Sequence, residues 1–205
     1  FVTLIIGVGV VESGIYKDIV SKVEVKKGNF ISFFTNKDRF IRYLKCIAIG
    51  LPTWFCIGIF AFFGNQFAEP LGIKDGLDPG LCIMWAYVGI SAGDFASGFI
   101  SHLLKSRKMA IFWMLVFTMI GVVLLVSGFA TTANGYYFFM GWLGLGTGYW
   151  AMFVTLGAEQ FGTNIRSTAA TTIPNMVRGS LPLMVLLFDY LKPDIIHLHN
   201  LHGYY

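Results

Sequence analysis

Residues 159–166, EQFGTNIR, are a short polar stretch between two long apolar segments, and the second of these segments carries Arg178 near its centre. A soluble core would not easily accommodate such an arrangement. In a bilayer the same pattern is typical of a tight charged turn at one face of the membrane, followed by a span whose buried charge is functional. The stretch therefore predicts a membrane-spanning helix on each side of it.

The composition of the whole chain also indicates a membrane protein. Hydrophobic residues make up 56% of the 205 positions and charged residues 13%, whereas about 25% of the residues in soluble domains are charged. A helix that crosses the hydrocarbon core needs about 20 mainly apolar residues. Segments of that length do not alternate polar with apolar residues, as barrel strands would, so we predict an all-α integral membrane protein. The expected spans are residues 41–63, 80–104, 109–130, 136–158 and 167–188.

Basic residues predict the orientation of these spans. Lys and Arg gather before and at the start of the first span, and again between the second and third spans at residues 105–108. Positively charged loops stay on the cytoplasmic side, and alternation then places residues 64–79 and 131–135 outside and residues 159–166 in the cytoplasm. We expect a multi-pass protein of the plasma (inner) membrane. Because the basic excess follows the membrane flanks, no nucleic-acid partner is expected.

Both ends of the chain are interpreted as parts of incomplete elements. Residues 1–11 are apolar but too short to cross a membrane, and they lack the features of a signal peptide, so they are expected to end a truncated span. Residues 12–40 mix charged and apolar side chains, which indicates a cytoplasmic linker, either with an amphipathic helix on the membrane surface or as a solvated connector. Residues 189–205 are interpreted as a truncated tail. The five-span bundle then covers residues 41–188.

Small residues and prolines predict how the spans pack and bend. The second span has small side chains at every fourth position, and the fourth span contains the GxxxG pair Gly144 and Gly148. Each stripe permits close backbone contact with a neighbouring helix. Prolines in the first and fifth spans remove backbone hydrogen bonds and can bend the helix there. The small residues of the second span are Gly89, Gly93, Ser97 and Ser101, and the prolines are Pro52, Pro174 and Pro182.

Two charged residues are expected deep in the membrane. Asp94 lies about ten residues from the cytoplasmic end of its span, a depth of about 15 Å, and Arg178 is comparably deep. Burying either charge alone would cost at least a few kcal/mol, so each is expected to face a cavity, a partner or a substrate. One hypothesis is a substrate or proton site, and the alternative is a structural pair of Asp94 with Arg178. Asn175, Trp150 and Tyr149 are further candidates for binding the substrate or ion.

The string GAEQFGTNIRSTAATTIPNMVRGSLPL, residues 157–183, resembles the loop and helix between the tenth and eleventh spans of major facilitator superfamily transporters. The loop GFISHLLKSRK, residues 98–108, is similar to the glycine-to-basic signature GxLxDrxGRR of that superfamily, with His102 at the acidic position and the second glycine missing. The resemblance implies that the chain is the carboxy-terminal half of a twelve-span major facilitator fold. The five spans would be spans seven to eleven, and the amino-terminal half would be missing.

The same resemblance implies a function and a gate. It implies a secondary active transporter that moves a small polar or anionic metabolite, such as a sugar or an organic acid, by alternating access. No nucleotide motif is present, so the expected partners are the substrate and a coupling proton or other ion, as in symport, with no cofactor. By this resemblance Glu159, Arg166 and Arg107 would form a cytoplasmic charge network that holds the inner gate. Topology anchoring is the alternative role for these three residues.

Two other classes of membrane protein stay open. An intramembrane aspartyl protease would need GxGD, where this chain has SAGD at residues 91–94, and a second Asp after a Tyr, whereas Asp189 precedes Tyr190. A non-transporting receptor or subunit also fits, because the other wall of the cavity would come from the missing half. The chain has no HExxH motif, and its 3 cysteines are isolated in apolar spans, so we expect neither a metal site nor an enzyme.

Overall fold

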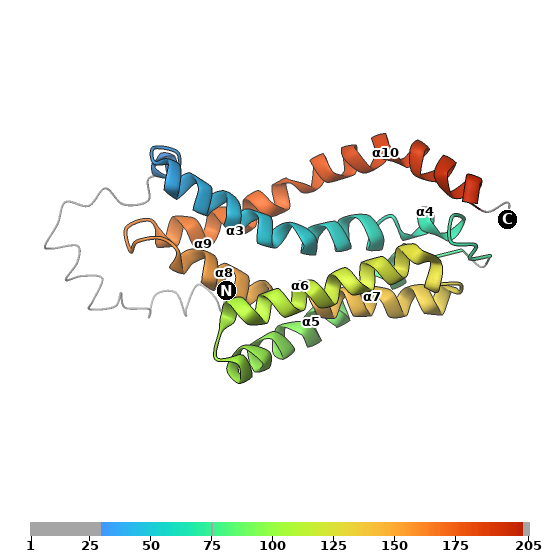
Figure 1. The fold of residues 1–205 in the computed structure, drawn as a ribbon, viewed down its shortest axis with the longest axis horizontal. Coiled ribbons are helices and arrows are strands. Elements are labelled where there is room, and N and C mark those ends of the chain that lie inside the picture. Colours follow the sequence, from blue (N-terminus) through green and yellow to red (C-terminus); the bar gives the residue numbers. More distant parts are fainter. Residues whose placement is uncertain (1–29, 75, 203–205) are drawn as a thin grey trace, which may run out of the picture.

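A computed structural model describes residues 30–74 and 76–202, with side chains to residue 191. These residues form helices, turns and loops but no strand, so the predicted all-α class is confirmed for the described part (Figure 1). The expected truncated span, residues 1–11, and most of the expected linker lie outside the described residues. The helical segments are η1 (Phe30–Phe33), α3 (Lys37–Phe55), η2 (Cys56–Ala61), α4 (Gly64–Ala68), α5 (Pro79–Leu104), α6 (Arg107–Leu124), η3 (Leu125–Phe129), α7 (Ala133–Thr147), α8 (Trp150–Glu159), α9 (Arg166–Gly179) and α10 (Leu181–His202).

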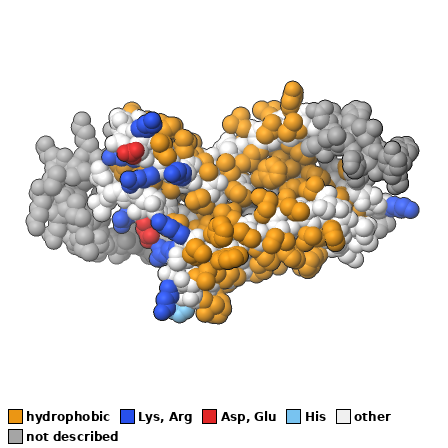
Figure 2. Space-filling view, in the orientation of Figure 1, with side chains coloured by type: hydrophobic (Ala, Val, Ile, Leu, Met, Phe, Trp, Pro, Cys, Tyr) orange, Lys and Arg blue, Asp and Glu red, His pale blue; other side chains and the backbone are white. Residues whose placement is uncertain are grey.

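Three helical segments are long and apolar enough to cross a membrane. They are Lys37–Ala61, Pro79–Leu104 and Arg107–Phe129, which correspond to the first three expected spans. Hydrophobic side chains cover the middle of the molecule, whereas Lys and Arg gather mainly at the end that carries the start of α3 and the loop between α8 and α9 (Figure 2). An apolar surface with charges at the end of the bundle is what a bilayer requires of a spanning bundle.

Polar residues in the loops determine where the long helices begin. The side chain of Asn36 accepts hydrogen bonds from two backbone N–H groups in the first turn of α3. Asp78 accepts one at the start of α5, Ser106 does so for α6, and Thr132 does so for α7. Each of these side chains satisfies an N–H group that has no partner within its own helix.

Glycines bring α5 and α7 into close contact. A Cβ atom added at Gly89 or Gly93 of α5 would collide with the backbone of the facing segment, and one added at Gly144 would collide with the backbone of α5. The close packing predicted from the small residues is therefore present, and the two stripes face each other. Figure 1 shows α5, α6 and α7 side by side, with α3, α9 and α10 on the other side of the molecule.

The fourth and fifth expected spans differ from the prediction because each is divided between two helices. Residues 136–158 are split where α7 ends at Thr147 and α8 begins at Trp150, with non-helical backbone angles at Gly148 and Tyr149. Residues 167–188 are split at Ser180, two residues before Pro182, which has no N–H to donate to a preceding turn.

Helical structure also continues beyond the fifth expected span. The helix α10 extends to His202, so residues 189–202, interpreted from the sequence as a tail, are helical.

Prolines have unequal effects on the helices. Pro52 lies inside α3, and four residues later the helix widens into the π-helical segment η2, in which Phe62 N–H bonds to Ile57 O at 3.0 Å. Pro174 is buried inside α9, which continues past it to Gly179. The bends predicted from prolines are thus matched by irregular helix near Pro52 and Pro182, and Pro174 leaves its helix uninterrupted.

Candidate functional site

A cavity of about 210 Å³ lies where α3, α5, α8 and α9 meet. It contains Asp94 from α5 and Arg178 from α9, and we call it the Asp94–Arg178 cavity. Two of the candidate residues identified from sequence thus line one cavity, and Trp150, the first residue of α8, lines it as well. The full lining consists of Thr53, Trp54, Ile57, Tyr87, Ile90, Asp94, Trp150 and Arg178.

Arg178 is held by two aromatic rings. Its Cζ atom lies 5.8 Å from the ring centroid of Trp54 and 5.6 Å from that of Trp150. The two indoles are 6.2 Å apart with an interplanar angle of 75°, so their faces meet the guanidinium from different directions. Such cation–π contacts orient a guanidinium and leave its edge free to donate hydrogen bonds. Arg178 is also in the last turn of α9, where the helix dipole favours a positive charge.

Asp94 meets the beginning of α8. Its Oδ1 atom accepts a hydrogen bond from the backbone N–H of Ala151 at 3.4 Å. The residue that precedes α8, Tyr149, provides no side-chain cap for this helix. The carboxylate of Asp94 therefore caps the N-terminus of α8, where the first N–H groups have no partner in their own helix. The positive end of the α8 dipole also favours the negative charge of Asp94.

Asp94 and Arg178 do not pair with each other. They line the same cavity, yet among the described residues no ion pair joins them. The alternative in which Asp94 and Arg178 form a structural pair between two helices is therefore not the arrangement in this structure. Each charge has its own separate support, which leaves both side chains with hydrogen-bonding capacity toward the cavity.

The break between α7 and α8 is stabilised from α3. The hydroxyl of Tyr149 donates to Ile49 O at 2.8 Å, and the hydroxyl of Thr53 donates to Thr147 O at 3.5 Å. Tyr149 is fully buried and does not line the cavity, so its contacts are those of a residue that supports the helix break. Since Thr53 also lines the cavity, the break and the cavity share a wall.

Asn175 is the other candidate that the structure places away from the cavity. It is exposed on α9 and is not part of the cavity lining. Conversely, sequence reasoning missed Trp54 and Tyr87, which do line it. Their only signal was an aromatic side chain within an apolar segment, and an exposed residue such as Trp113, which does not line the cavity, has the same signal.

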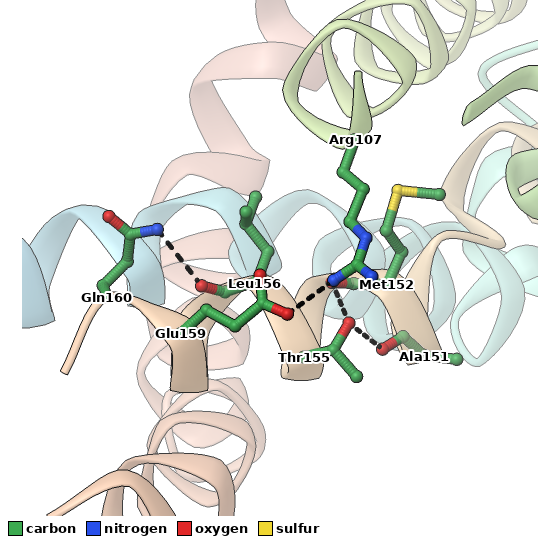
Figure 3. A network of polar contacts seen from close by, with 7 residues as sticks. All are labelled: Arg107, Ala151, Met152, Thr155, Leu156, Glu159 and Gln160. Carbon is green, nitrogen blue, oxygen red and sulfur yellow. Dashed lines mark hydrogen bonds and ion pairs between the residues drawn. The ribbon is translucent and has the colours of Figure 1, made fainter. Parts of the chain in front are cut away.

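Two of the three expected gate residues form an ion pair. Arg107 begins α6 and Glu159 ends α8, and Nη1 of Arg107 lies 2.7 Å from Oε1 of Glu159 (Figure 3). Both side chains are 49% exposed. Each charge is at the end of its helix that the dipole disfavours, so the pair offsets an unfavourable placement on both helices.

Arg166, the third expected member, does not join this pair. It begins α9 and is exposed. Within the described part of the chain it forms no ion pair. In this structure the expected three-residue network is therefore an Arg107–Glu159 pair, with Arg166 apart from it.

Among the described residues, no three His, Cys, Asp or Glu side chains come together in a group that could hold a metal ion. Cys46, Cys56 and Cys82 are buried and free. The three cysteines are buried at separate positions, so they pack in the interior as small apolar side chains.

Comparisons with protein families, with curated protein sequences and with solved structures find no match to this chain. The resemblance to major facilitator transporters stays a prediction that depends on the motifs in the sequence.

Proposed function

We propose that this chain is part of a secondary active transporter that moves a small polar or anionic metabolite across a membrane by alternating access. The Asp94–Arg178 cavity is the observation that carries the proposal. It places a carboxylate and a guanidinium, which form no ion pair among the described residues, beside the break between α7 and α8. Transporters commonly form their substrate and ion sites in this way, from discontinuous helices inside the membrane.

Both divided spans border the proposed site. Trp150 is the first residue of α8, and Arg178 is in the last turn of α9, two residues before the interruption at Ser180. Irregular backbone at membrane depth is tolerated where it is buried in protein or faces a water-filled cavity. Helix breaks beside a cavity also supply hinges, which alternating access needs.

Cavity size supports a small substrate. Pockets that bury drug-sized ligands measure about 300–1,000 Å³, and the volume here is about 210 Å³. We further propose, from the sequence resemblance, that the chain is the carboxy-terminal half of a twelve-span fold in the plasma (inner) membrane. In that arrangement an amino-terminal half supplies the opposite wall of the cavity.

In the same proposal an ion gradient drives transport and no cofactor takes part. Asp94 is the group that carries a coupling proton, because it is a carboxylate inside the cavity. The Arg107–Glu159 pair links the start of α6 to the end of α8 and stabilises the closed inner gate.

An aspartyl-type protease is the weaker candidate. Asp94 is the only carboxylate among the described residues that line the cavity, whereas that chemistry uses two carboxylates that share a proton. A receptor or non-transporting subunit would bind a ligand in the same cavity but would not move it, so flux separates the two functions.

Flux in proteoliposomes tests the proposal. The complete protein, with the proposed amino-terminal half, is reconstituted, a proton gradient is imposed, and uptake of labelled sugars, organic acids and amino acids is measured. We expect saturable, gradient-dependent accumulation of at least one compound, which Asp94→Asn abolishes. Asp189→Asn is the matched control, because Asp189 is an exposed residue of α10 away from the cavity. Saturable binding without flux would instead indicate a receptor.

A further inference from the structure

The charges of the Asp94–Arg178 cavity define the kind of ligand that fits it. The cavity carries one negative side chain from α5 and one positive side chain from α9. Among the described residues these two form no ion pair with each other. The two opposite charges thus line one cavity of about 210 Å³, in which a ligand could contact both.

Neither charge is saturated by its present partners. The guanidinium of Arg178 lies over the rings of Trp54 and Trp150, and among the described residues no ion pair uses any of its five N–H donors. Asp94 accepts one backbone hydrogen bond, from Ala151, whereas a carboxylate has about four acceptor positions. Both groups are therefore oriented by protein contacts while most of their hydrogen bonds are available to a ligand.

Ligands with a single charge fit this cavity poorly. An anion that pairs with Arg178 also comes near the carboxylate of Asp94, and a cation that pairs with Asp94 comes near Arg178. Placing like charges next to each other is a strong source of discrimination between ligands. A ligand that carries both charges meets an opposite charge at each end.

We infer that the Asp94–Arg178 cavity binds a small zwitterion, whose carboxylate or phosphate pairs with Arg178 and whose ammonium group pairs with Asp94. This inference rests on the proposed function and narrows its substrate class. The remaining part of the ligand lies against the apolar side chains of Ile57 and Ile90, which also line the cavity.

Binding of matched compounds to the complete protein in detergent, with the proposed amino-terminal half present, tests the inference. Each set contains an amino acid, the amine that lacks its carboxylate and the acid that lacks its ammonium group: alanine with ethylamine and propionate, leucine with isopentylamine and 4-methylpentanoate, phenylalanine with phenethylamine and 3-phenylpropionate. We expect at least one amino acid to bind ten or more times more tightly than both of its analogues. If the acid binds as tightly as the amino acid in every set, the inference is overturned and the proposed transport of anions stays intact.

Two variants assign the ends of the ligand. Asp94→Asn should remove the preference for the amino acid over its acid, and Arg178→Gln should remove the preference over its amine. Asp189→Asn should keep both preferences. If neither cavity variant folds, Asp94→Glu should retain the preference for the amino acid over its acid. The comparison of the amino acid with its two analogues in the unaltered protein then tests the inference. If no amino acid binds, the zwitterion inference is overturned. The flux assay with sugars and organic acids tests the proposed transport independently.

Discussion

Neutralising the Arg107–Glu159 pair should open the proposed inner gate. The pair is half-exposed, with a 2.7 Å contact between the two helices, and exposed ion pairs contribute about 0.2–1 kcal/mol. At the upper limit, Glu159→Gln would raise the ratio of open to closed molecules about fivefold, since about 1.4 kcal/mol corresponds to a factor of ten. A change of this size is sufficient to shift a gate whose two states are close in free energy.

The double variant has a different expected result. Glu159→Gln leaves Arg107 unpaired at the start of α6, where the helix dipole disfavours a positive charge. Arg107→Gln leaves Glu159 unpaired at the end of α8, where a negative charge is disfavoured. Changing both removes the pair and both unfavourable placements, so opening by the double variant should be smaller than the sum of the single effects.

Labelling from the cytoplasmic side measures the opening. A cysteine replaces Ile90, which lines the cavity, in a chain whose native cysteines Cys46, Cys56 and Cys82 are changed to alanine. A membrane-impermeant maleimide should react several times faster in each single variant. Arg166→Gln is the control and should leave the rate unchanged, because Arg166 is outside the pair. Unchanged rates in all variants, or strictly additive effects, would refute the gate and leave only a role in topology.

Three further substitutions test the site and its support. Arg178→Lys keeps the charge but loses the bidentate geometry, so affinity for an anionic or zwitterionic substrate should fall about tenfold, or about 1.4 kcal/mol; equal affinity by titration would rule out bidentate recognition. Tyr149→Phe removes the bond to Ile49 O and should lower the free energy of unfolding by about 1 kcal/mol, measured by denaturation in detergent. Gly144→Ala places a Cβ against the backbone of α5 and should destabilise by about 1–3 kcal/mol, whereas Gly98→Ala, which meets no atom within 4 Å, should not.

Local features of the chain were sufficient for the class of fold. Apolar length and composition predicted helices able to cross a membrane, and three are present within about four residues of the expected positions. Small residues at every fourth position in the second span predicted a close helix contact, and α5 makes one with α7 through Gly89 and Gly144. Helix length, hydropathy and the spacing of small residues can be predicted from sequence because each depends on residues within one helix.

Helix breaks were harder to predict. Gly148 was recognised as one member of a stripe that packs helices, yet with Tyr149 it also ends α7. A glycine in an apolar span permits either outcome. The difference lies in contacts from α3, whose Thr53 and Ile49 bond to the ends of the broken span, and these contacts are separated from it by many residues.

By itself the sequence determined the helical class of the described residues, helices long and apolar enough to cross a membrane, and Asp94 and Arg178 as unusual charges in apolar segments. Only the tertiary structure decided that these two charges line one cavity without pairing, that Trp54 and Trp150 hold the guanidinium, and that Arg107 rather than Arg166 meets Glu159. The physical reason is that hydropathy and helix periodicity act along one segment of chain. The direction in which a charged side chain points depends on how separate helices cross, and it is set by packing between residues far apart in sequence.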